Sequence, residues 1–582
     1  MKLQNGSART GAFILLDNLI QNGVEYIFGY PGGAILPIYD ELHFWEEGNL
    51  VKHILVRHEQ AAIHAADAYA RSSSKVGVCF ATSGPGATNL VTGIANAKMD
   101  SIPLIIITGQ VTRAFIGTDA FQETDIFGIT LPIVKHSYTV RNTSMLPSIF
   151  SEAFFLAQNG RPGPILIDIP KDVGLEKIRK YVYVKLPNLF LKNNYRSELI
   201  AQRVLLAKIL NYLQEAYKPL IYLGGGILRA NAFKVVQQFA KLRQLPAVTT
   251  LMGKSAFNEF DHLSLGMVGM HGAAYANFSI SECDLLLTCG ARFDDRVTGK
   301  LDEFACNAEV IHLDIDPAEI SKNRCPQLSI LGDLRTVFSE IISYQRKFRK
   351  IKRKQTKSWQ KRIQRWKQHY PLQPATRSEG HNLSPQQCIS LIGESYADAF
   401  FTTDVGQHQM WAAQLINCQP KKWISSAGLG TMGFGLPAAI GAILANPLQQ
   451  VVCITGDSSF QMNIQELGTI AQYQLPIRIF IINNRCQGMV RQWQETFYQN
   501  RYSHSLMRAG IPNFAQLAHA YGLLGYEPYQ LDNLKKLLVT FTKKNISDSF
   551  LCATIVDIQV LQTENCYPML VPGRSNSQML GL

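Results

Sequence analysis

The chain repeats one local pattern along most of its length: a short apolar run, then a turn, then a longer stretch with helical periodicity. The apolar runs are four to six residues long, rich in β-branched residues, and bounded by polar residues. Runs without a polar face predict strands buried on both sides, which is typical of parallel sheets covered by helices. The pattern therefore predicts an α/β fold with doubly wound parallel sheets. The clearest runs are 76–81, 104–108, 165–169, 220–223, 285–289, 310–313, 400–403, 451–455, 477–482 and 552–556.

The length of the chain, 582 residues, predicts about three domains of this kind. Two polar segments, 185–197 and 346–384, are the candidate boundaries. We therefore expect a first domain at 1–185, a central domain at 190–345, a basic linker at 346–374, a third domain at 375–560 and a C-terminal tail at 561–582.

The positive charge of the chain is concentrated in one place. The net charge is +13, and between Arg346 and Lys367 there are twelve Lys or Arg and no acidic residue. The remainder of the chain is near neutral, so we interpret this stretch as a solvated, helical interdomain linker. A nucleic-acid-binding or partner-binding surface is the alternative. We expect no nucleic acid as a partner.

Other bulk features bear on the compartment. No apolar run reaches the roughly 18 residues that a membrane helix needs, so no membrane association is expected. The eleven Cys show no CxxC spacing, which favours a reducing compartment. The N-terminus lacks the layout of a signal peptide or transit peptide. We expect the plastid (chloroplast) stroma if the protein is plastid-encoded, and a bacterial cytoplasm otherwise.

The strongest motif lies in the third domain. Gly456-Asp457-Ser458 follows a predicted strand, and after 24 further residues Asn483-Asn484 follows the next. Both groups then lie at one edge of a sheet, because parallel strands end together. A carboxylate and an amide oxygen there can hold a hard divalent cation such as Mg²⁺. The helix expected after Ser459 would direct its N-terminus toward an anion, so the arrangement suggests a metal–diphosphate site.

This arrangement resembles the thiamine-diphosphate motif, usually GDG followed by 24 to 27 residues and NN, with Ser458 in place of the last Gly. The resemblance implies that Gly456, Asp457, Ser458 and Asn484 contact thiamine diphosphate and its Mg²⁺. It further implies that Asp457, Asn484 and the main-chain oxygen of Cys486 ligate the metal. By chance alone, a turn after a strand plus an unrelated Asn pair would give the same letters.

Other residues are assigned by the same resemblance. Glu59, after a strand expected at 54–57, would be the catalytic carboxylate that activates the aminopyrimidine. Gln407 and His408 would approach the diphosphate, and Met432, in a Gly-rich loop, would support the bent cofactor. Without the resemblance, Glu59 would be a helix-capping acid and Met432 a core residue.

Longer strings resemble one family in particular, the acetolactate synthases. They include FGYPGGAILPIYDEL, ATSGPGATNLVTGIANAKMD, GRPGPILIDIPKDV, CGARFDDRVTG, GLGTMGFGLPAAIGA and NNRCQGMVRQWQETFY, and together they cover the chain from about residue 10 to the end. The resemblance implies pyrimidine-binding, FAD-binding and diphosphate-binding domains in that order. It also implies decarboxylation of pyruvate and transfer of the two-carbon unit to pyruvate or 2-ketobutyrate, in valine, leucine and isoleucine biosynthesis. The alternative is a redox-active pyruvate oxidase on the same scaffold.

FAD is expected mainly from the resemblance. The turn Gly224-Gly225-Gly226 follows a strand, but the last position of a GxGxxG fingerprint is Arg229, so the motif alone is weak. The resemblance implies a structural FAD near 271–292 and 314–333, where Asp314 or Asp316 would bind a ribose hydroxyl. The full FAD set is Arg161, Gly224, Gly225, His271, Arg292, Asp314 and Asp333.

Substrate residues are assigned in the same way. Arg296 would bind the carboxylate of the second keto acid, since a guanidinium can make two hydrogen bonds to it. Trp493 would pack against its alkyl group, and Lys171 would lie near the substrate channel. Gly33 and Gln110 would polarise intermediates through a backbone N–H and an amide. The family pattern further implies a homodimer or larger oligomer with active sites at the subunit interface, and a small regulatory subunit.

Overall fold

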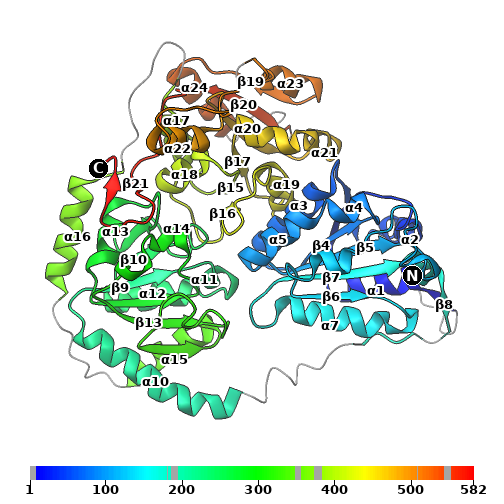
Figure 1. Ribbon diagram of the computed structural model, residues 1–582, viewed down its shortest axis with the longest axis horizontal. Helices are drawn as coiled ribbons and strands as arrows, with labels where there is room; N and C mark the ends of the chain where they lie inside the picture. Colours follow the sequence, from blue (N-terminus) through cyan, green and yellow to red (C-terminus); the bar gives the residue numbers. More distant parts are fainter. Residues whose placement is uncertain are drawn as a thin grey trace.

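The computed structural model describes residues 8–179, 181–184, 195–347, 356–372, 383–507, 509–542 and 552–582. In these residues the chain forms three six-stranded sheets, every one of them parallel throughout and covered by helices on both faces. Figure 1 shows them as three bodies: the N-terminal one in blue and cyan, the central one in green, and the C-terminal one in yellow and orange. The predicted fold class is confirmed.

The N-terminal sheet has the order β3-β2-β4-β5-β7-β6. Its strands are β2 (Tyr26–Gly29), β3 (Lys52–Leu55), β4 (Gly77–Ala81), β5 (Leu104–Gln110), β6 (His136–Thr139) and β7 (Pro164–Pro170). Its helices are α1 (Gly11–Gln21), α2 (Leu36–Glu47), α3 (Glu59–Ser73), α4 (Pro85–Thr88), α5 (Val91–Asp100), α6 (Ile126–Thr130), α7 (Leu146–Gln158) and α8 (Lys171–Leu175). A two-stranded ribbon, β1 (Arg9–Thr10) with β8 (Lys177–Ile178), joins the two ends of this domain.

The central sheet has the order β11-β10-β9-β12-β13-β14. Its strands are β9 (Pro219–Leu223), β10 (Ala247–Thr249), β11 (Ser264–Met267), β12 (Leu285–Cys289), β13 (Glu309–Asp314) and β14 (Leu328–Leu331). Its helices are α10 (Tyr195–Glu215), α11 (Gly226–Arg229), α12 (Phe233–Arg243), α13 (Ala274–Glu282), α14 (Asp295–Thr298), α15 (Leu334–Lys347) and α16 (Lys357–His369). This strand order, 3-2-1-4-5-6 along the chain, is that of dinucleotide-binding Rossmann folds.

The C-terminal sheet has the order β16-β15-β17-β18-β20-β19, the same arrangement as the N-terminal sheet. Its strands are β15 (Phe400–Thr403), β16 (Trp423–Ser425), β17 (Val451–Gly456), β18 (Ile477–Asn483), β19 (Leu524–Tyr526) and β20 (Thr554–Gln559). Its helices are α17 (Pro385–Ser395), α18 (Gln407–Leu415), α19 (Gly435–Ala445), α20 (Asp457–Phe460), α21 (Leu467–Gln472), α22 (Gly488–Phe497), α23 (Phe514–Ala520) and α24 (Leu531–Thr542).

Every predicted apolar run overlaps a strand of one of these sheets, because residues buried on both faces leave no polar face to detect. The strand before Glu59 differs in its bounds: it is Lys52–Leu55 and not 54–57. Pairing ends there because Arg57 turns its backbone N–H to Glu466 of the C-terminal domain. The helix expected after Ser459 begins earlier, at Asp457, and ends at Phe460.

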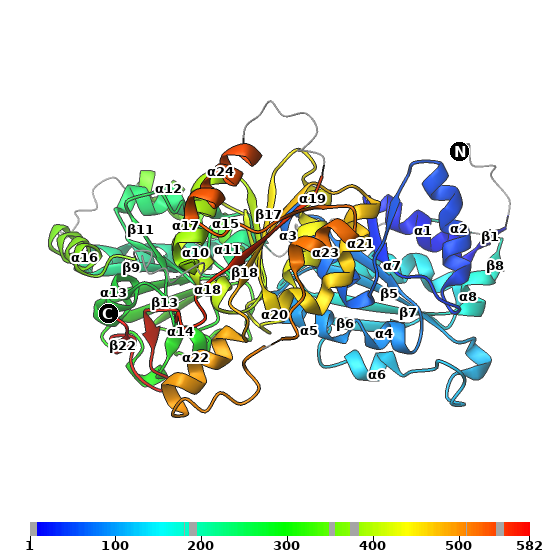
Figure 2. The same cartoon turned by 90° about the horizontal axis from the view of Figure 1, so that it is seen from above.

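The N- and C-terminal domains meet where α3 packs against α19. One hydrophobic core continues across this contact, from the Ala-rich face of α3 to Leu436 and Ile440 of α19. The helices approach so closely at Gly441 that a Cβ there would lie 2.0 Å from the Ala65 carbonyl oxygen. Both views show the two helices side by side, so the contact joins the two domains within one chain (Figure 2).

Part of the basic segment is a helix packed on the central domain. In α16, Trp359 is buried and donates from Nε1 to the Pro219 carbonyl, at 3.2 Å. Ile363 is also buried, and Lys367 donates to the Ser264 carbonyl. The expected helix is therefore present at 357–369, but one face of it belongs to a domain core. Residues 348–355, which hold much of the predicted linker's charge, lie outside the described residues.

The C-terminal tail returns from the third domain to the central one, as the red segment of Figure 1 shows. Its two short strands, β21 (Met569–Leu570) and β22 (Met579–Leu580), pair antiparallel. Leu570 N–H donates to the Met270 carbonyl, and the Asn576 amide donates to the Val297 carbonyl. The tail thereby connects these two domains. None of the described helices is long and apolar enough to cross a membrane.

Candidate active site at the carboxyl edges of the sheets

The candidate metal motif lies at the point of the C-terminal sheet where the strand order reverses. β15 and β17 are neighbours there, and the segments that follow them diverge to opposite sides. Gln407 and His408 follow β15, and Gly456 ends β17. His408 lies against Gly456 so closely that a Cβ on the glycine would meet its Nδ1 at 2.7 Å. Ligands of doubly wound folds bind at such switch points, beyond the carboxyl ends of the strands.

Three oxygen-bearing groups meet at this edge. Asp457 is buried, and its Oδ2 has no hydrogen-bond partner among the described residues. Asn484 is also buried, and its Oδ1 accepts from Cys486 N–H at 3.2 Å. Ser458 donates toward the Cys486 carbonyl at 3.4 Å. An unpaired buried carboxylate oxygen beside an amide and a carbonyl oxygen fits a hard cation, which takes oxygen ligands.

Burial raises the pKa of the Asp457 carboxyl to about 7, and the nearby Asp557 adds to the shift. A cation bound beside Asp457 would favour the ionised carboxylate and lower this pKa. Burial lowers the pKa of His408 to about 3, so its ring is neutral. The Nε2 of this ring has no partner within the described part of the chain.

The amides around the motif hold one another in place. Asn484 Nδ2 donates to Gln407 Oε1 at 3.2 Å, and Gln407 Nε2 donates to Gln492 and to the Glu564 carbonyl. Gly488 leaves room for this packing, because a Cβ there would lie 2.1 Å from Gln407 Oε1. Gln407 is therefore fixed from three directions, which gives Asn484 one orientation.

The segment containing Met432 lies at the same edge, between β16 and α19. We call residues 426–434 the β16–α19 loop. Two of its three glycines, Gly430 and Gly433, have φ of 75° and 88°, which side-chain-bearing residues rarely adopt. Asp404, directly after β15, accepts from Gly433 N–H at 2.8 Å and from Gly435 N–H at 3.2 Å. Met432 itself is half-buried, between these anchored residues.

Glu59 lies at the corresponding edge of the N-terminal sheet, as the first residue of α3. It is buried, and its Oε2 accepts from Asn89 Nδ2 at 2.9 Å. Gly86 packs against Oε1, where a Cβ would approach to 3.1 Å. No hydrogen bond among the described residues joins Glu59 to Asp457 or Asn484.

Gly33, Gln110 and Lys171 surround the same edge, after β2, at the end of β5 and after β7. Gly33 is exposed, and the preceding Gly32 packs on Thr82, across the switch point between β2 and β4. Gln110 is buried and donates to the Thr124 carbonyl and to Asp168 Oδ2, at 3.0 and 3.1 Å. Lys171 is half-buried. The N-terminal candidates are thus gathered at one edge.

The residues assigned to FAD gather at the carboxyl edge of the central sheet. Gly224 follows β9 and packs on Gly290, which follows β12, so closely that a Cβ would lie 2.0 Å from the Gly290 oxygen. These two strands form the switch point of the Rossmann order. Gly225 packs in the same way against Met252. The remaining members that follow strands are His271 after β11, Arg292 after β12, Asp314 at the end of β13 and Asp333 after β14.

Individual contacts refine this set. Arg161 reaches from the N-terminal domain and pairs with Asp316 and Glu319 of the central domain, at 3.1 and 2.7 Å. Asp333 caps α15, since its Oδ1 accepts from Thr336 N–H. His271 is buried between the central domain and the tail, and burial lowers its pKa to about 4. The arrangement offers backbone, carboxylate and guanidinium groups along one edge of the sheet, which fits a dinucleotide.

Arg296 and Trp493 come from different domains. Arg296 lies on α14, and its side chain is 65% exposed, with Asp295 at 3.8 Å as its ion-pair partner. Trp493 lies on α22 and stacks at a tilt on Phe497, with ring centroids 5.2 Å apart. Helices α14 and α22 lie near each other in both views.

Sequence reasoning missed several buried polar residues near these edges. Asp404 holds the β16–α19 loop, and Asp168 holds Gln110. Glu466 accepts from Arg57 N–H, two residues before Glu59. The position of Asp404 and Asp168 at strand ends was a usable signal, because acids there seldom belong to a core. Glu466 had no comparable signal, since it follows a helical turn.

Comparisons with known proteins agree with this architecture. Three domain models of one family match the chain: the thiamine pyrophosphate enzyme N-terminal TPP binding domain at 9–129, the central domain at 206–341 and the C-terminal TPP binding domain at 404–547. The fold and the matched domains define a thiamine-diphosphate-dependent enzyme.

Full-length relatives identify the family within this class of enzymes. The acetolactate synthase large subunit of Porphyra purpurea is 57% identical, over 99% of this chain and 96% of the relative. That of Cyanidium caldarium is 56% identical, over 100% and 98%. That of Buchnera aphidicola subsp. Schizaphis graminum is 44% identical, over 98% of both. The chain belongs to the acetolactate synthase large-subunit family.

Proposed function

We propose that this chain forms acetolactate at a site shared between two copies, with Glu59 from one chain and Asp457 from the other. The observation that supports the proposal is that each edge is preorganised by its own contacts, while no hydrogen bond among the described residues connects the two edges within one chain. Where the two domains of one chain do meet, α3 and α19 occupy the contact. A second copy of the chain would then supply the other half of each active site.

Exposed apolar side chains beside the N-terminal edge support a partner copy. The segment that follows β5 exposes Phe121 by 87%, Phe115 by 58% and Leu131 by 58%. Patches of this kind on soluble chains mark interaction surfaces. The segment lies beside Gln110, whose amide donates to the Thr124 carbonyl within it. A partner that covers this patch would also cover the candidate catalytic edge.

Thiamine diphosphate and Mg²⁺ fit the C-terminal edge. Asp457, Asn484 and the Cys486 carbonyl would hold the metal, and Gln407 and His408 would lie toward the diphosphate, with Gly456, Ser458 and Met432 completing the site. When bound, thiamine diphosphate supplies the electron sink for decarboxylation of a 2-keto acid. Glu59, which is buried, would hold or release the proton on the cofactor's aminopyrimidine.

FAD is proposed at the carboxyl edge of the central sheet. Gly224 and Gly225 would allow the cofactor to approach the backbone closely, and Asp314 or Asp316 would accept from a ribose hydroxyl, with Asp333 near the same edge. Arg161 and Arg292 would face its negative charge. The support is the Rossmann strand order and the switch point at Gly224 and Gly290. We propose a structural role for FAD, as in the family pattern described above.

The substrates are proposed to be pyruvate and, as acceptor, pyruvate or 2-ketobutyrate. Arg296 is exposed and its charge is only loosely paired, so its guanidinium is available for a carboxylate. Trp493 would contact the alkyl group of the acceptor, Lys171 would lie near the entrance, and Gly33 and Gln110 would donate to oxygen atoms of the reacting groups. An oxidase would not need a site for a second keto acid.

The names of the relatives, "large subunit", support a separate smaller regulatory subunit as a partner of this chain. Their sources, algae and bacteria, support a plastid stroma or a bacterial cytoplasm as the compartment. The domain limits 1–185, 190–345 and 375–560 remain our proposal for the three units, with the tail 561–582 attached to the central one.

Product analysis tests the proposed function. Purified protein receives pyruvate, Mg²⁺, thiamine diphosphate and FAD, beside a Glu59→Gln variant that preserves shape and removes the charge. We expect acetolactate from the wild type and at least about a hundredfold less from the variant, within the usual range for loss of an acid–base group. Acetate or peroxide with bleaching of the flavin would instead indicate an oxidase, and would overturn the roles of Arg296 and Trp493.

A further inference from the structure

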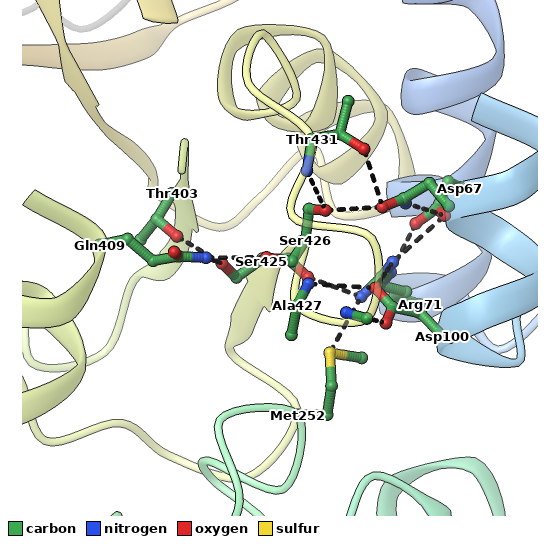
Figure 3. A network of polar contacts seen from close by, with 12 residues as sticks. Asp67, Arg71, Asp100, Met252, Thr403, Gln409, Ser425, Ser426, Ala427 and Thr431 are labelled. Atoms are coloured by element: carbon green, nitrogen blue, oxygen red, sulfur yellow. Dashed lines mark hydrogen bonds and ion pairs between the residues drawn. The ribbon is translucent and has the colours of Figure 1, made fainter. Parts of the chain in front are cut away.

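The β16–α19 loop is held by the N-terminal domain of its own chain as well as by its own domain. Figure 3 shows the contact, in which side chains of α3 and α5 meet the start of the loop. Asp100 accepts from Gly428 N–H at 2.9 Å, and Arg71 donates to the Ser425 carbonyl at 2.9 Å. The charged groups are buried and paired, since Arg71 contacts both Asp67 and Asp100.

The Ser426 hydroxyl connects this cluster to the residue before Met432, and Thr431 Oγ1 also donates directly to Asn96 Oδ1, at 3.4 Å. Ser426 Oγ donates to Asn96 Oδ1 at 2.6 Å. It also accepts from Thr431 N–H at 2.8 Å (Figure 3). Ser426 and Asn96 are fully buried. A serine hydroxyl has one proton, so the acceptor it points to decides which lone pair remains for Thr431. Asn96 therefore sets the direction of the hydroxyl that anchors the loop.

The direction of the Asn96 amide is itself determined. Its Nδ2 donates to Asp67 Oδ2 at 3.2 Å, and a carboxylate can only accept. The amide oxygen must therefore face Ser426. Asp67 is in turn oriented by Arg71, four residues along α3. Asp67, Asn96, Ser426 and Thr431 thus form a chain of hydrogen bonds in which every donor and acceptor is specified.

The far end of the loop is joined to the candidate metal motif. Asp404 accepts from Gly433 N–H and also from Thr455 Oγ1, at 2.8 and 3.5 Å. Thr455 is two residues before Asp457. Between the two anchors lie Leu429 and Gly430, which are exposed at the tip. The loop therefore has two supports, one from its own sheet and one from the N-terminal domain.

We propose that the Asn96–Ser426 hydrogen bond positions the β16–α19 loop for thiamine diphosphate, so that the N-terminal domain of each chain shapes the cofactor site of its own C-terminal domain. Asn96 and Ser426 are positioning residues, because they act through Thr431 and the following Met432 and do not face the site themselves. The inference rests on the proposed function, which places the cofactor at this edge.

The test measures thiamine diphosphate binding by calorimetry at saturating Mg²⁺ and without pyruvate. Ser426→Ala and Asn96→Ala each raise the Kd about tenfold, the equivalent of one buried hydrogen bond. The double variant weakens binding by less than the two single effects combined, since both changes remove the Asn96–Ser426 link. Ser426→Thr, which keeps the hydroxyl, recovers most of the affinity, and this recovery also shows that the other variants are not merely misfolded.

Tyr473→Phe is the matched control. The Tyr473 hydroxyl also bridges the N- and C-terminal domains, accepting from Leu55 N–H at 2.8 Å and donating toward the His53 carbonyl at 3.3 Å. It lies just before β18, at the opposite edge of the sheet from the loop. We expect its removal to leave the Kd within about twofold of the wild type, because the loop keeps both supports.

Each other outcome overturns the inference. Unchanged affinity in Ser426→Ala, additive effects in the double variant, or equal weakening in Tyr473→Phe would each show that the Asn96–Ser426 link does not position the loop. In those cases the wild type still binds the cofactor and forms acetolactate, so the proposed function stands. A wild type that binds no thiamine diphosphate would remove the proposed function and this inference together.

Discussion

At the scale of single residues, the candidate site depends on small side chains that let larger ones meet. Gly456 admits His408, Gly86 admits Glu59, and Gly488 admits the pair Gln407 and Asn484. At each position a methyl group would occupy space now filled by a polar atom of the site. The site therefore depends on these glycines as much as on its charged residues.

Gly488→Ala tests this point directly. The added Cβ would lie 2.1 Å from Gln407 Oε1 and 2.6 Å from Asn484 Nδ2, so Asn484 must move. We expect affinity for Mg²⁺, titrated in the presence of thiamine diphosphate, to fall at least about tenfold. Gly510→Ala is the control, because nothing lies within 4 Å of its Cβ position. Equal Mg²⁺ affinity in the two variants would exclude Asn484 as a ligand.

Glu466 gives a prediction about pH. Burial raises the pKa of this carboxyl to about 7, well above its value in an unfolded chain. The folded state therefore holds a proton that the unfolded state has lost, and stability falls as the pH rises from about 4.5 to 7. Glu466→Gln removes this titrating group. Between pH 5 and pH 8 the free energy of unfolding should therefore decrease by about 2 kcal/mol less in the variant than in the wild type.

Thermal unfolding of both proteins across this pH range measures the difference. Glutamine can still accept from Arg57 N–H, and Thr469 can then donate to the Leu55 carbonyl, which it already approaches at 3.3 Å. The variant should therefore fold. Parallel pH profiles for wild type and variant would mean that Glu466 is ionised in the folded protein throughout.

At the scale of elements, helix α3 contributes both to the candidate site and to the contact between the N- and C-terminal domains. Its first residue, Glu59, faces the carboxyl edge of its own sheet, and its last turns bring Asp67 and Arg71 to the C-terminal domain. Its middle packs on α19 through small residues, Ala65 against Gly441. The Ala-rich composition that suggested a tightly packed helix is explained by this crossing.

Gly441→Ala should separate the two helices. In an isolated helix the change would stabilise by about 1 kcal/mol, because Ala is the better helix former. Here the Cβ would lie 2.0 Å from the Ala65 carbonyl oxygen, and backbone must shift. We expect a loss of about 2 to 4 kcal/mol, seen as a lower Tm. Gly48→Ala, whose Cβ would make an ordinary contact of 3.4 Å, should leave the Tm nearly unchanged.

At the scale of the whole molecule, the shared site predicts complementation between two inactive variants. Glu59→Gln inactivates the N-terminal half of a site, and Asp457→Ala inactivates the C-terminal half. In a dimer that contains one chain of each variant, one site carries both substitutions and the other carries neither. With random pairing about a quarter of the sites are active, so co-refolded protein should regain about a quarter of the wild-type rate.

The measurement is acetolactate formation by each variant alone and by the co-refolded mixture at equal total concentration. If both halves came from the same chain, every site in the mixture would carry one change, and the mixture would be as inactive as its components. Mixing the folded variants without refolding is the control, and it should show recovery only as fast as subunits exchange.

Much of the fold could be predicted from local pattern. Strands such as 451–455 and 477–482 are apolar on both faces, and this alone indicates a covered parallel sheet. The edge that carries Asp457 and Asn484 follows from the same argument, since parallel strands place their carboxyl ends together. The sequence resemblance then assigned the cofactor, the metal and the roles of Glu59 and Gln407.

Tertiary structure decided what depends on contacts between distant segments. The packing of α16 on the central domain, the return of the tail to Met270 and Val297, and the link from Asp67 through Asn96 to Ser426 join residues far apart in the chain. Local periodicity reports only which face of an element is buried. It does not report which partner buries that face, or which donor meets which acceptor, because those follow from how the three domains pack together.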